Sequence, residues 1–388
     1  MNILVVPPSD WVYHPLRNRL HFIFERLART HRVYVLWFRM NRWGTSPRQT
    51  NVTLIRTAKS FGQELQRNGP TAYYLKNCRG IWNALNSVIG ELRIDVVVHG
   101  NILPSAMVAL RRGVPLVYDY AEYYSESASA YYRNPVAKRL VHSGVKLLTD
   151  FALSRSDLVI TVAHSQAEYV REIVPDRKIE VVPNGVDLDI FRPEDRSQAR
   201  RELGLPERDF LVVYEGSIDE WVDIGILVKA INSLRNEGIN ATLVLLGGSQ
   251  TGFYAKRLQN TVREYGLDKE VIFAGFVPYE RVPLFINAGD VAVAPYKKIM
   301  KNDGTPLKIL EYLACNQIVL CTRIPELERR FRDHLYFFDR YDELLSLLRS
   351  VATSRISRSD VNSRNHILPY SWTTLSQRYA DILRSVAS

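Results

Sequence analysis

The sequence lacks several features that mark particular classes of protein. It has no run of about 18 apolar residues, so no membrane-spanning helix is predicted. Its three cysteines, Cys78, Cys315 and Cys321, show no metal-ligand spacing, and their odd number argues against a disulfide framework. The segment from Met1 to Pro7 is too short for a signal peptide and has no charged leader, so it predicts a first strand. These features together favour a reducing cytoplasm.

Motifs of several enzyme classes are also missing. No Gly-x-Gly-x-x-Gly follows the first predicted strand and no Walker Gly-Lys-Ser/Thr occurs, which disfavours a dehydrogenase and a nucleotide hydrolase. No Gly-x-Ser-x-Gly elbow is present either. The Asp187-Leu188-Asp189 segment mimics a metal-binding Asp-x-Asp, but it follows Asn184-Gly185, which predicts turn and cap chemistry. Because no cluster has metal-ligand spacing, we expect neither a metal nor a cofactor.

Positive charge is concentrated in the first part of the chain. Residues 1–150 contain 20 Lys and Arg against 9 Asp and Glu, whereas the whole chain has 51 against 41, so the remainder is nearly neutral. Lys138, His142 and Lys146 recur every four residues beside Arg139, which predicts a basic helix face. The excess favours an anionic partner, a membrane surface or a phosphorylated lipid, although a solvated basic face gives the same pattern. Nucleic acid is disfavoured, because no nucleic-acid-binding motif accompanies the charge.

Length and pattern predict two domains of one kind. A chain of 388 residues exceeds what one hydrophobic core usually serves. In both halves, short β-branched runs alternate with helical patterns, which predicts an α/β fold of two doubly wound, Rossmann-like domains that bind ligands at the carboxyl ends of their strands. The expected strands are Asn2–Pro7, Val33–Phe38, Asp95–His99, Leu116–Asp119, Leu158–Val162, Glu180–Val182, Phe210–Glu215, Thr242–Leu246, Val271–Ala274, Val291–Ala294, Ile318–Cys321 and Tyr336–Phe338. The expected helices include Pro15–Arg29, Ala72–Glu91, Pro104–Arg112, Pro135–Ser154, Ser165–Ile173 and Ser371–Ser385.

Residues 302–314 (NDGTPLKILEYLA) are the most informative segment, because they predict a loop that leads into a helix. Gly304 permits close backbone approach, Thr305 can cap the helix, and Pro306 suits its first position. The helix start presents the N–H groups of Leu307 and Lys308 together with a partial positive charge. Both favour a phosphate.

Lys308 and Glu311 are three residues apart, so they share a face of this helix. A cation near a phosphate site and a carboxylate one turn deeper would suit a nucleotide, with the carboxylate accepting two ribose hydroxyls. For this segment by itself, an ordinary capped amphipathic helix remains the alternative.

The segment from Val181 to Asp187 (VVPNGVD), followed by an α/β pattern that carries residues 302–314, resembles the retaining glycosyltransferases of family 4, which have the GT-B fold. In that family a Glu-x7-Glu motif binds the donor; here Asp303 stands first and Glu311 second. The resemblance covers nearly the whole chain and implies an acceptor-side domain over 1–187, a nucleotide-sugar domain over 188–370, and a helix over 371–388 that crosses back to the first domain. It also implies retention without a metal or a covalent intermediate.

On the donor side, the resemblance places a glycine turn after the first strand of the second domain and an apolar residue beside the base. Typical members follow the turn with an Arg and a Lys, which this chain lacks. We expect Lys308 and one of Lys297, Lys298 and Lys301 to bind the diphosphate instead, although a solvated loop would also explain these lysines. The expected donor contacts are Gly216, Ser217, Val277, Lys298, Gly304, Thr305, Pro306, Leu307 and Glu311, with Asp303 and Lys308 at the reacting groups.

On the acceptor side, three strand ends of the first half carry polar side chains. The expected acceptor contacts are Arg17, Arg19, His21, Asn101, Asp119 and Glu122, since guanidinium groups bind phosphate and carboxylates accept from hydroxyls. The two arginines could equally be surface residues, and His99 is predicted to be buried and hydrogen-bonded rather than catalytic.

Two function classes follow from these observations. The first is a retaining glycosyltransferase with a nucleotide-sugar donor and a glycan or lipid-linked anionic acceptor, peripheral at the cytoplasmic membrane face. The second is a noncatalytic GT-B relative that binds nucleotide or glycan as a partner subunit. The Asp at position 303 and the missing Arg/Lys pair favour the second; the intact stretch from Pro306 to Glu311 favours the first.

Overall fold

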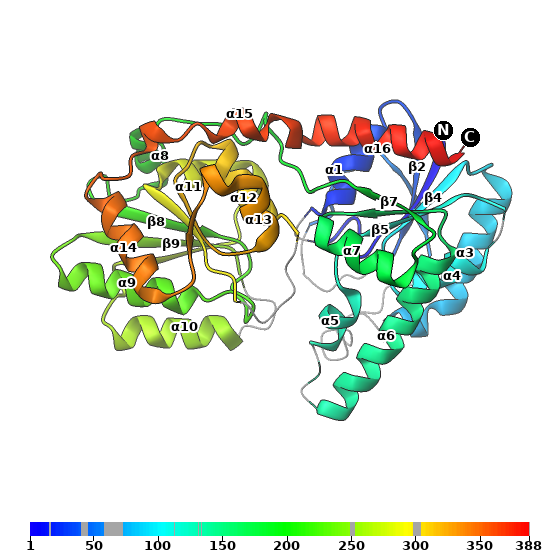
Figure 1. The fold of residues 1–388 in the computed structure, drawn as a ribbon, viewed down its shortest axis with the longest axis horizontal. Coiled ribbons are helices and arrows are strands. Elements are labelled where there is room, and N and C mark those ends of the chain that lie inside the picture. The colour runs from blue at the N-terminus through cyan, green and yellow to red at the C-terminus, as the bar shows by residue number, and fades with distance from the viewer. Residues whose placement is uncertain are drawn as a thin grey trace. The chain divides into compact units, whose positions relative to one another are not determined.

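The computed structural model describes the chain except residues 15–16, 40–45, 58–72, 112, 131, 133, 249–252, 298–303 and 388. The chain divides into two compact units (Figure 1). Unit 1 comprises Met1–Pro183 and Trp372–Ser388, and unit 2 comprises Asn184–Ser371. The chain therefore leaves the first unit near its middle and returns to it for the last helix.

In the described part of unit 1, seven parallel strands form one sheet in the order β3-β2-β1-β4-β5-β6-β7. The order reverses at β1, which pairs with both β2 and β4, so the sheet is doubly wound. The strands are β1 (Asn2–Val6), β2 (Arg32–Trp37), β3 (Thr53–Arg56), β4 (Val96–His99), β5 (Leu116–Tyr120), β6 (Leu158–Thr161) and β7 (Lys178–Val181). Strand β3 was not predicted from the sequence; it is a short edge strand whose residues are not fully buried, so its apolar pattern is weak.

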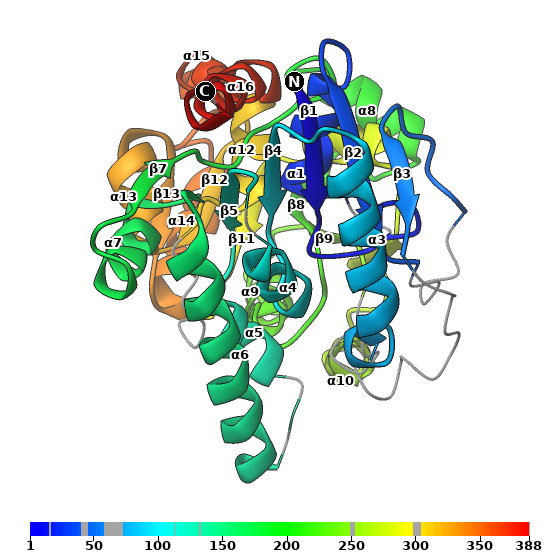
Figure 2. The same ribbon diagram turned by 90° about the vertical axis from the view of Figure 1, so that its right-hand side faces the viewer.

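The helices of unit 1 cover this sheet and include the end of the chain. They are α1 (Arg19–Leu27), α3 (Cys78–Glu91), α4 (Leu103–Leu110), α5 (Tyr124–Ser129), α6 (Pro135–Arg155), α7 (His164–Ile173) and α16 (Trp372–Ala387). Helix α16 packs along α1, as both views show (Figures 1 and 2). The rings of Phe22 and Trp372 stack at 5.0 Å, and Phe24 meets Tyr379 edge-on at 5.5 Å. These aromatic pairs hold the returning helix on the first unit.

In the described part of unit 2, six parallel strands form a second doubly wound sheet in the order β10-β9-β8-β11-β12-β13. The strands are β8 (Phe210–Glu215), β9 (Ala241–Leu246), β10 (Val271–Gly275), β11 (Val291–Ala294), β12 (Val319–Thr322) and β13 (Tyr336–Phe338). The helices are α8 (Arg196–Leu203), α9 (Ile224–Asn236), α10 (Phe253–Glu264), α11 (Val282–Ala288), α12 (Leu307–Ala314), α13 (Pro325–Phe331), α14 (Tyr341–Ala352) and α15 (Ser363–Ile367), with short 3-10 turns η1 (Tyr279–Arg281), η2 (Arg332–His334), η3 (Arg358–Asp360) and η4 (Leu368–Tyr370).

The predicted two-domain α/β architecture, the GT-B fold, is confirmed. Strands such as β4 and β11 are buried along their whole length, as expected where helices cover both faces of a parallel sheet. Three local predictions were wrong. The first helix begins at Arg19, with the Asn18 side chain as its cap, and not at Pro15; helix α5 was missed; and α12 begins one residue later than expected, at Leu307.

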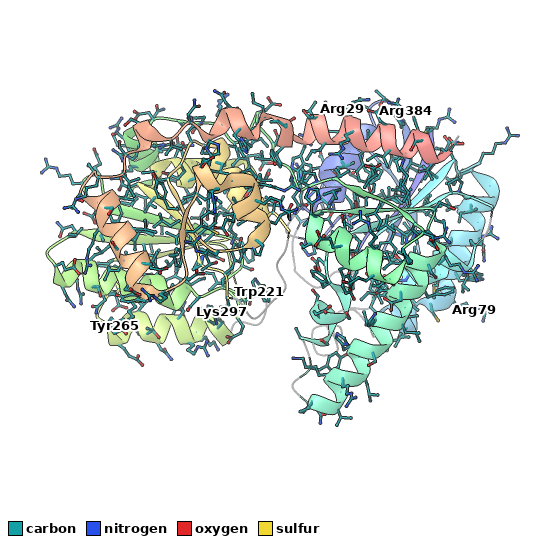
Figure 3. All side chains as sticks on the ribbon, in the orientation of Figure 1. Arg29, Arg79, Trp221, Tyr265, Lys297 and Arg384 are labelled. Atoms are coloured by element: carbon teal, nitrogen blue, oxygen red, sulfur yellow. The ribbon has the colours of Figure 1, made fainter. Side chains whose placement is uncertain are left out.

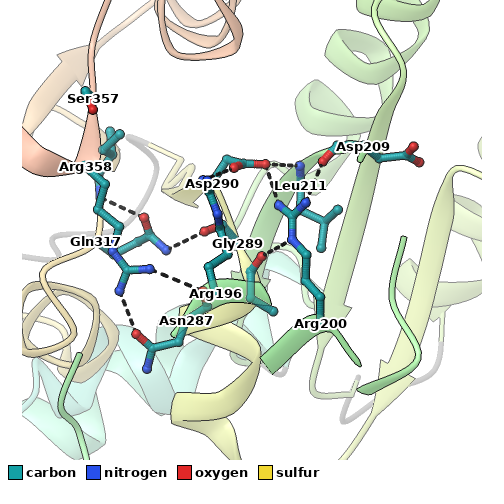
Figure 4. A network of polar contacts seen from close by, with 12 residues as sticks. Arg196, Arg200, Asp209, Leu211, Asn287, Gly289, Asp290, Gln317, Ser357 and Arg358 are labelled. Carbon is teal, nitrogen blue, oxygen red and sulfur yellow. Dashed lines mark hydrogen bonds and ion pairs between the residues drawn. The ribbon is translucent and has the colours of Figure 1, made fainter. Parts of the chain in front are cut away.

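A polar network at the amino ends of the unit 2 strands fixes α8 and the loop before β11 (Figure 4). The buried guanidinium of Arg200 donates to the Asp290 carboxylate at 2.7 Å and to the Asp209 carbonyl at 3.0 Å. The same carboxylate accepts from the Leu211 N–H at 2.7 Å. Because each buried charge has a partner, the network can stabilise this edge of the sheet. The opposite edge, where the strands end, carries the candidate site.

Candidate functional site

Adjacent strands of the unit 2 sheet end in glycine turns that hydrogen-bond to one another. Gly216, directly after β8, donates its N–H to the Leu246 carbonyl at 3.0 Å, and Gly247 donates to the Gly275 carbonyl at 2.7 Å. Both donors have positive φ, 124° at Gly216 and 111° at Gly247. The strand ends are thereby joined in a compact layer of backbone.

Neither of these two glycines can be replaced without displacing a neighbour. A Cβ atom on Gly216 would overlap the ammonium group of Lys308, and one on Gly247 would overlap the carbonyl of Gly216. Only glycine adopts these φ values freely. The turn therefore brings bare backbone against the side chain of Lys308.

Helix α12 starts beside this layer and is anchored by the mid-chain motif. The Nδ2 atom of Asn184, in the Pro-Asn-Gly-Val-Asp stretch, donates to the Thr305 carbonyl at 2.9 Å. Pro306 is the N-cap residue, with φ −62° and ψ 140°, and no side chain caps the helix. The predicted cap by Thr305 and the predicted first position of Pro306 were therefore wrong. The hydroxyl of Thr305 is buried without a partner among the described residues.

Lys308 lies on the first turn of α12, and its side chain points at the rings of Tyr214 and Tyr296. Its Nζ atom donates to the Tyr214 hydroxyl at 3.1 Å and lies 4.3 Å from the centroid of that ring and 5.5 Å from that of Tyr296. Burial lowers the pKa of Lys308, while the nearby carboxyl groups of Glu215 and Glu311 oppose this shift. The site thus holds one positioned cation in a setting of low dielectric.

Glu311, one turn further along α12, is 5% exposed and lies against a second carboxyl group. Burial raises the pKa of Glu311 well above its usual value, and the neighbouring carboxylate of Glu215 raises it further; a hydrogen bond from Tyr279 and the charge of Lys308 act in the opposite direction. Glu215 is held at the end of β8, where its backbone N–H donates to the Tyr312 hydroxyl at 2.9 Å. Two carboxyl groups and one ammonium group therefore converge at one point.

The loop after the Gly216 turn is closed by side chains rather than by a cation. The indole of Trp221 donates to the Ser217 hydroxyl at 3.1 Å, and the Tyr214 hydroxyl donates to the Ser217 carbonyl at 2.7 Å. Lys297 lies beside Trp221 (Figure 3), and its backbone N–H donates to the backbone carbonyl of Trp221 at 3.0 Å. Its ammonium group is 3.7 Å from the Glu220 carboxylate. Among the candidates for the missing diphosphate cation, Lys297 is thus already paired, and Lys298 and Lys301 lie outside the described residues.

The remaining predicted donor contacts are distributed as follows. Val277 is partly buried and packs on the core of unit 2, directly after the exposed ring of Phe276, which lies over Gly248. Gly304 precedes α12, and Leu307 is its first residue. Asp303, predicted to face the transferred sugar, lies outside the described residues.

Three of the predicted acceptor contacts are in the core of unit 1. Arg19 and Asp119 form a buried ion pair, with Nε and Oδ2 3.5 Å apart, and the Tyr379 hydroxyl of α16 donates to the same Oδ2 atom at 2.8 Å. His21 is fully buried: it stacks on Trp11 at 4.0 Å and forms a capping box with Asn18, and burial lowers its pKa well below the usual value. These contacts bury the three side chains within unit 1, while the Nε, Nη1 and Nη2 atoms of Arg19 have no hydrogen-bond partner among the described residues. Their role at the acceptor stays a prediction.

The other acceptor-side residues divide into buried and exposed. Asn101 is buried, and its Nδ2 atom donates to the Pro7 carbonyl at 2.7 Å and the Tyr74 hydroxyl at 2.8 Å. His99 is fully buried, and its Nε2 atom is 3.2 Å from the Oγ atom of Ser156. Burial lowers the pKa of His99 to about 3, so the ring is neutral. Arg17 is partly exposed and Glu122 is exposed. Of the six predicted contacts, only these last two present substantial surface.

Sequence reasoning missed the aromatic and acidic residues around Lys308. Tyr214 and Glu215 immediately precede Gly216, so a polar pair directly before a strand-end glycine was a usable signal. Tyr279 and Tyr312 carry no such signal, because their positions depend on how η1 and α12 pack. Across the residues that the structure describes, no three His, Cys, Asp or Glu side chains are grouped to hold a metal ion.

Two protein-family models match successive parts of this chain. Residues 17–190 match the model named Glycosyltransferase Family 4, and residues 195–366 match Glycosyl transferases group 1. The chain belongs to glycosyltransferase family 4. The two matches of this family 4 chain meet near the boundary between units 1 and 2.

Individual relatives of this family 4 chain are distant. A D-inositol 3-phosphate glycosyltransferase from Acidothermus cellulolyticus is 30% identical over 47% of the chain and 41% of that protein, and one from Catenulispora acidiphila is 23% identical over 78% and 77%. The chain matches about two fifths of the length of the first of these. Among solved structures, sucrose-phosphate synthase from Thermosynechococcus elongatus has a TM-score of 0.78 at 16% identity over 99% of this chain and 98% of that one. Anabaena HepE in complex with UDP-glucose has a TM-score of 0.73 at 16% identity, covering 99% and 100%.

Proposed function

We propose that this chain is a retaining glycosyltransferase that takes a nucleotide-sugar donor at the glycine turns and helix start of unit 2. The observation that carries the proposal is the position of Lys308 and Glu311 on consecutive turns of α12, with Lys308 directly against Gly216. A cation beside bare backbone suits a diphosphate, and a buried carboxylate one turn deeper suits the ribose hydroxyls.

The mechanism needs stabilised charge on the leaving diphosphate. Lys308 and the start of α12 supply it, because a preorganised cation and helix N–H groups act at the point where charge develops. Asp303 then faces the hydroxyls of the transferred sugar, as the family motif implies. The donor's own phosphate assists the incoming hydroxyl, so the reaction keeps the anomeric configuration without a covalent protein intermediate. No metal is required, since Lys308 takes its place.

A uracil nucleotide is the first donor to test. The support is the fold of HepE, solved with UDP-glucose, together with the turn after β10, where Val277 and the exposed Phe276 can cover one face of a base.

For the acceptor, we propose a lipid-linked or otherwise anionic glycan at the cytoplasmic face of a membrane. Relatives named for D-inositol 3-phosphate support an anionic acceptor, as does the excess of 20 Lys and Arg over 9 Asp and Glu in residues 1–150. In the described part of the chain, no helix combines the length and the apolar character needed to cross a bilayer.

One observation favours a second candidate, a GT-B relative that binds a nucleotide or glycan without catalysis. The family's usual Arg and Lys after the glycine turn are replaced by residues 217–223 (SIDEWVD), and Lys297 is paired with Glu220. Lys308 would then be the one described cation at the turn.

Two measurements test the proposal. Thermal shift against a panel of nucleotide sugars should show stabilisation by a donor in excess, and that donor should be hydrolysed slowly to free sugar. The anomeric configuration of the released or transferred sugar, read by NMR, should match that of the donor. A sugar with the inverted anomeric configuration would contradict the retaining mechanism. Binding of the donor without hydrolysis or transfer would favour the noncatalytic relative.

A further inference from the structure

Helix α6 is packed against unit 1 along one side only. Its Val145, Thr149, Ala152 and Leu153 are buried, all in the second half of the helix. The first turns extend past the rest of unit 1, as Figures 1 and 2 show from two directions. The Asn134 side chain caps this end by accepting from the N–H groups of Val136 and Ala137, at 2.9 and 3.1 Å. The projecting end is therefore a formed helix.

The outer side of α6 carries large apolar side chains in one row. Val136, Leu140 and Leu147 are 68%, 69% and 71% exposed. Their spacings of four and seven residues place them on one face of a helix. In the described part of the chain, eight large hydrophobic residues are exposed and these three are the most exposed of them, so the row is not the ordinary scatter of surface leucines.

Basic side chains flank this row. Arg139 is exposed on the first turns and Arg155 at the end, one to each side of the row. Lys138 is exposed too, but it is two residues from Val136 and from Leu140 and so projects from the opposite side of the helix. Asp150, the acidic residue of α6, forms an ion pair with Lys146, with Nζ and Oδ2 2.6 Å apart. His142 lies 3.8 Å from Glu126 of α5. The exposed side of the helix thus combines aliphatic residues with uncancelled positive charge, which is the composition of a helix that lies in the plane of an anionic bilayer.

We propose that α6 is the surface by which this protein docks on an anionic phospholipid bilayer. Val136, Leu140 and Leu147 enter the boundary between headgroups and acyl chains, and Arg139 and Arg155 lie at the headgroup phosphates. A second copy of the chain is a poorer occupant, since a two-fold dimer pairs this face with itself and brings two surfaces of the same positive charge together.

This inference deepens the proposed action at a membrane face and rests on it for its purpose. Its evidence is the surface of α6 and does not involve the donor site. Nucleotide binding and vesicle binding can therefore succeed or fail separately.

The test is co-sedimentation of the full chain with vesicles of phosphatidylcholine alone and of phosphatidylcholine containing phosphatidylglycerol, at low and high salt. The wild type should bind the anionic vesicles, more weakly at high salt. The double variant Leu140→Glu/Leu147→Glu should reduce the partition coefficient at least about tenfold. A matched variant, Leu75→Glu/Leu368→Glu, makes the same charge change at leucines that are 58% and 50% exposed elsewhere, and it should bind within about twofold of the wild type.

A second variant separates the charge from the apolar row. Arg139→Gln/Arg155→Gln should weaken binding at low salt and have a smaller effect at high salt, because salt screens the attraction that it removes. Thermal unfolding of each variant checks that α6 and its unit remain folded.

Three outcomes would overturn the proposal. Equal binding of the wild type and Leu140→Glu/Leu147→Glu would move the docking surface elsewhere. A dimer in sedimentation velocity that this variant dissociates would make a second copy the occupant. If the wild type stays in the supernatant with every vesicle, α6 docking and the membrane-face acceptor both fail, while thermal shift with nucleotide sugars still decides the donor function.

Discussion

The ammonium group of Lys308 lies 3.1 Å from the hydroxyl of Tyr214 and 4.3 Å from the centroid of its ring, so α12 and the end of β8 are joined by a cation that rests on an aromatic face. Cation–π contact stabilises a partly desolvated ammonium group without a carboxylate bound to it directly. The charge is thus positioned before a ligand arrives, as electrostatic stabilisation of a diphosphate requires.

Replacing Lys308 by methionine should raise the dissociation constant of the nucleotide-sugar donor at least about tenfold, or ~1.4 kcal/mol, because it removes one charge-assisted contact and keeps the aliphatic stem. Isothermal titration with the donor identified by thermal shift measures this. The control is Lys229→Met on α9, whose ammonium group lies over the Tyr341 ring at 4.1 Å. Equal donor affinity in Lys308→Met and the wild type would remove Lys308 from the site.

Gly216→Ala should lose donor affinity as well as stability. Its φ of 124° is strained for alanine, and the added Cβ would push the ammonium group of Lys308 aside. Gly204→Ala is the matched control: Gly204 ends α8 with φ 64° but has open space around it, so only the backbone cost of about 1 kcal/mol is expected. Unfolding and donor titration of both variants separate the two effects. Donor affinity that falls equally in both would point to general destabilisation instead.

Glu311→Gln should weaken donor binding by about tenfold, ~1.4 kcal/mol, since an amide presents one acceptor oxygen to the two ribose hydroxyls instead of two. A 2′-deoxyribose nucleotide should lose less affinity in this variant than in the wild type, which links the effect to the ribose. Exposed Glu280, on η1, gives the control Glu280→Gln, for which no change is expected. Retained ribose discrimination in Glu311→Gln would place the ribose elsewhere.

The pH dependence of kcat/KM for the donor should be a narrow bell. Burial lowers the pKa of Lys308, so its positive charge disappears at a lower pH than that of an ordinary lysine as the pH rises. Burial and the carboxylate of Glu215 raise the pKa of Glu311, so its carboxylate is lost sooner as the pH falls. Lys308→Arg should move the alkaline limb to higher pH and leave the acid limb in place, because guanidinium remains protonated. A profile unchanged by this substitution would assign the alkaline limb to another group.

Asp119→Ala should destabilise unit 1 by about 3–5 kcal/mol, because it leaves the guanidinium of Arg19 buried without its partner. Tyr379→Phe, which removes one hydrogen bond to Asp119, should cost about 1 kcal/mol. The surface pair of Lys146 and Asp150 supplies the control Asp150→Ala, expected at about 0–1 kcal/mol. Denaturant unfolding followed by circular dichroism measures all three. A stable Asp119→Ala that loses transfer would restore Asp119 as an acceptor contact.

Local patterns in the sequence were sufficient for the architecture. Period and composition predicted every strand in the described part of unit 2, because buried parallel strands are short, continuous apolar runs that need no tertiary information. The same kind of evidence failed for β3, a short edge strand that is only partly buried, and for α5, a six-residue helix (YSESAS) that is mostly polar and shows no apolar period. The pairing of Lys308 with Glu311 followed from their spacing of three on one helix.

What the sequence by itself determined is thus the two doubly wound sheets, the helix that carries Lys308 and Glu311, and the basic character of α6. Only the tertiary structure decided which charged side chains are buried. Arg19, His21 and Asp119 have the composition of a binding site, but α16 and Trp11 cover them. Glu215 and Tyr214 meet Lys308 because β8 and α12 are brought together across about 94 residues of chain. Burial and long-range contact depend on how elements pack, and no local pattern in the chain encodes that packing directly.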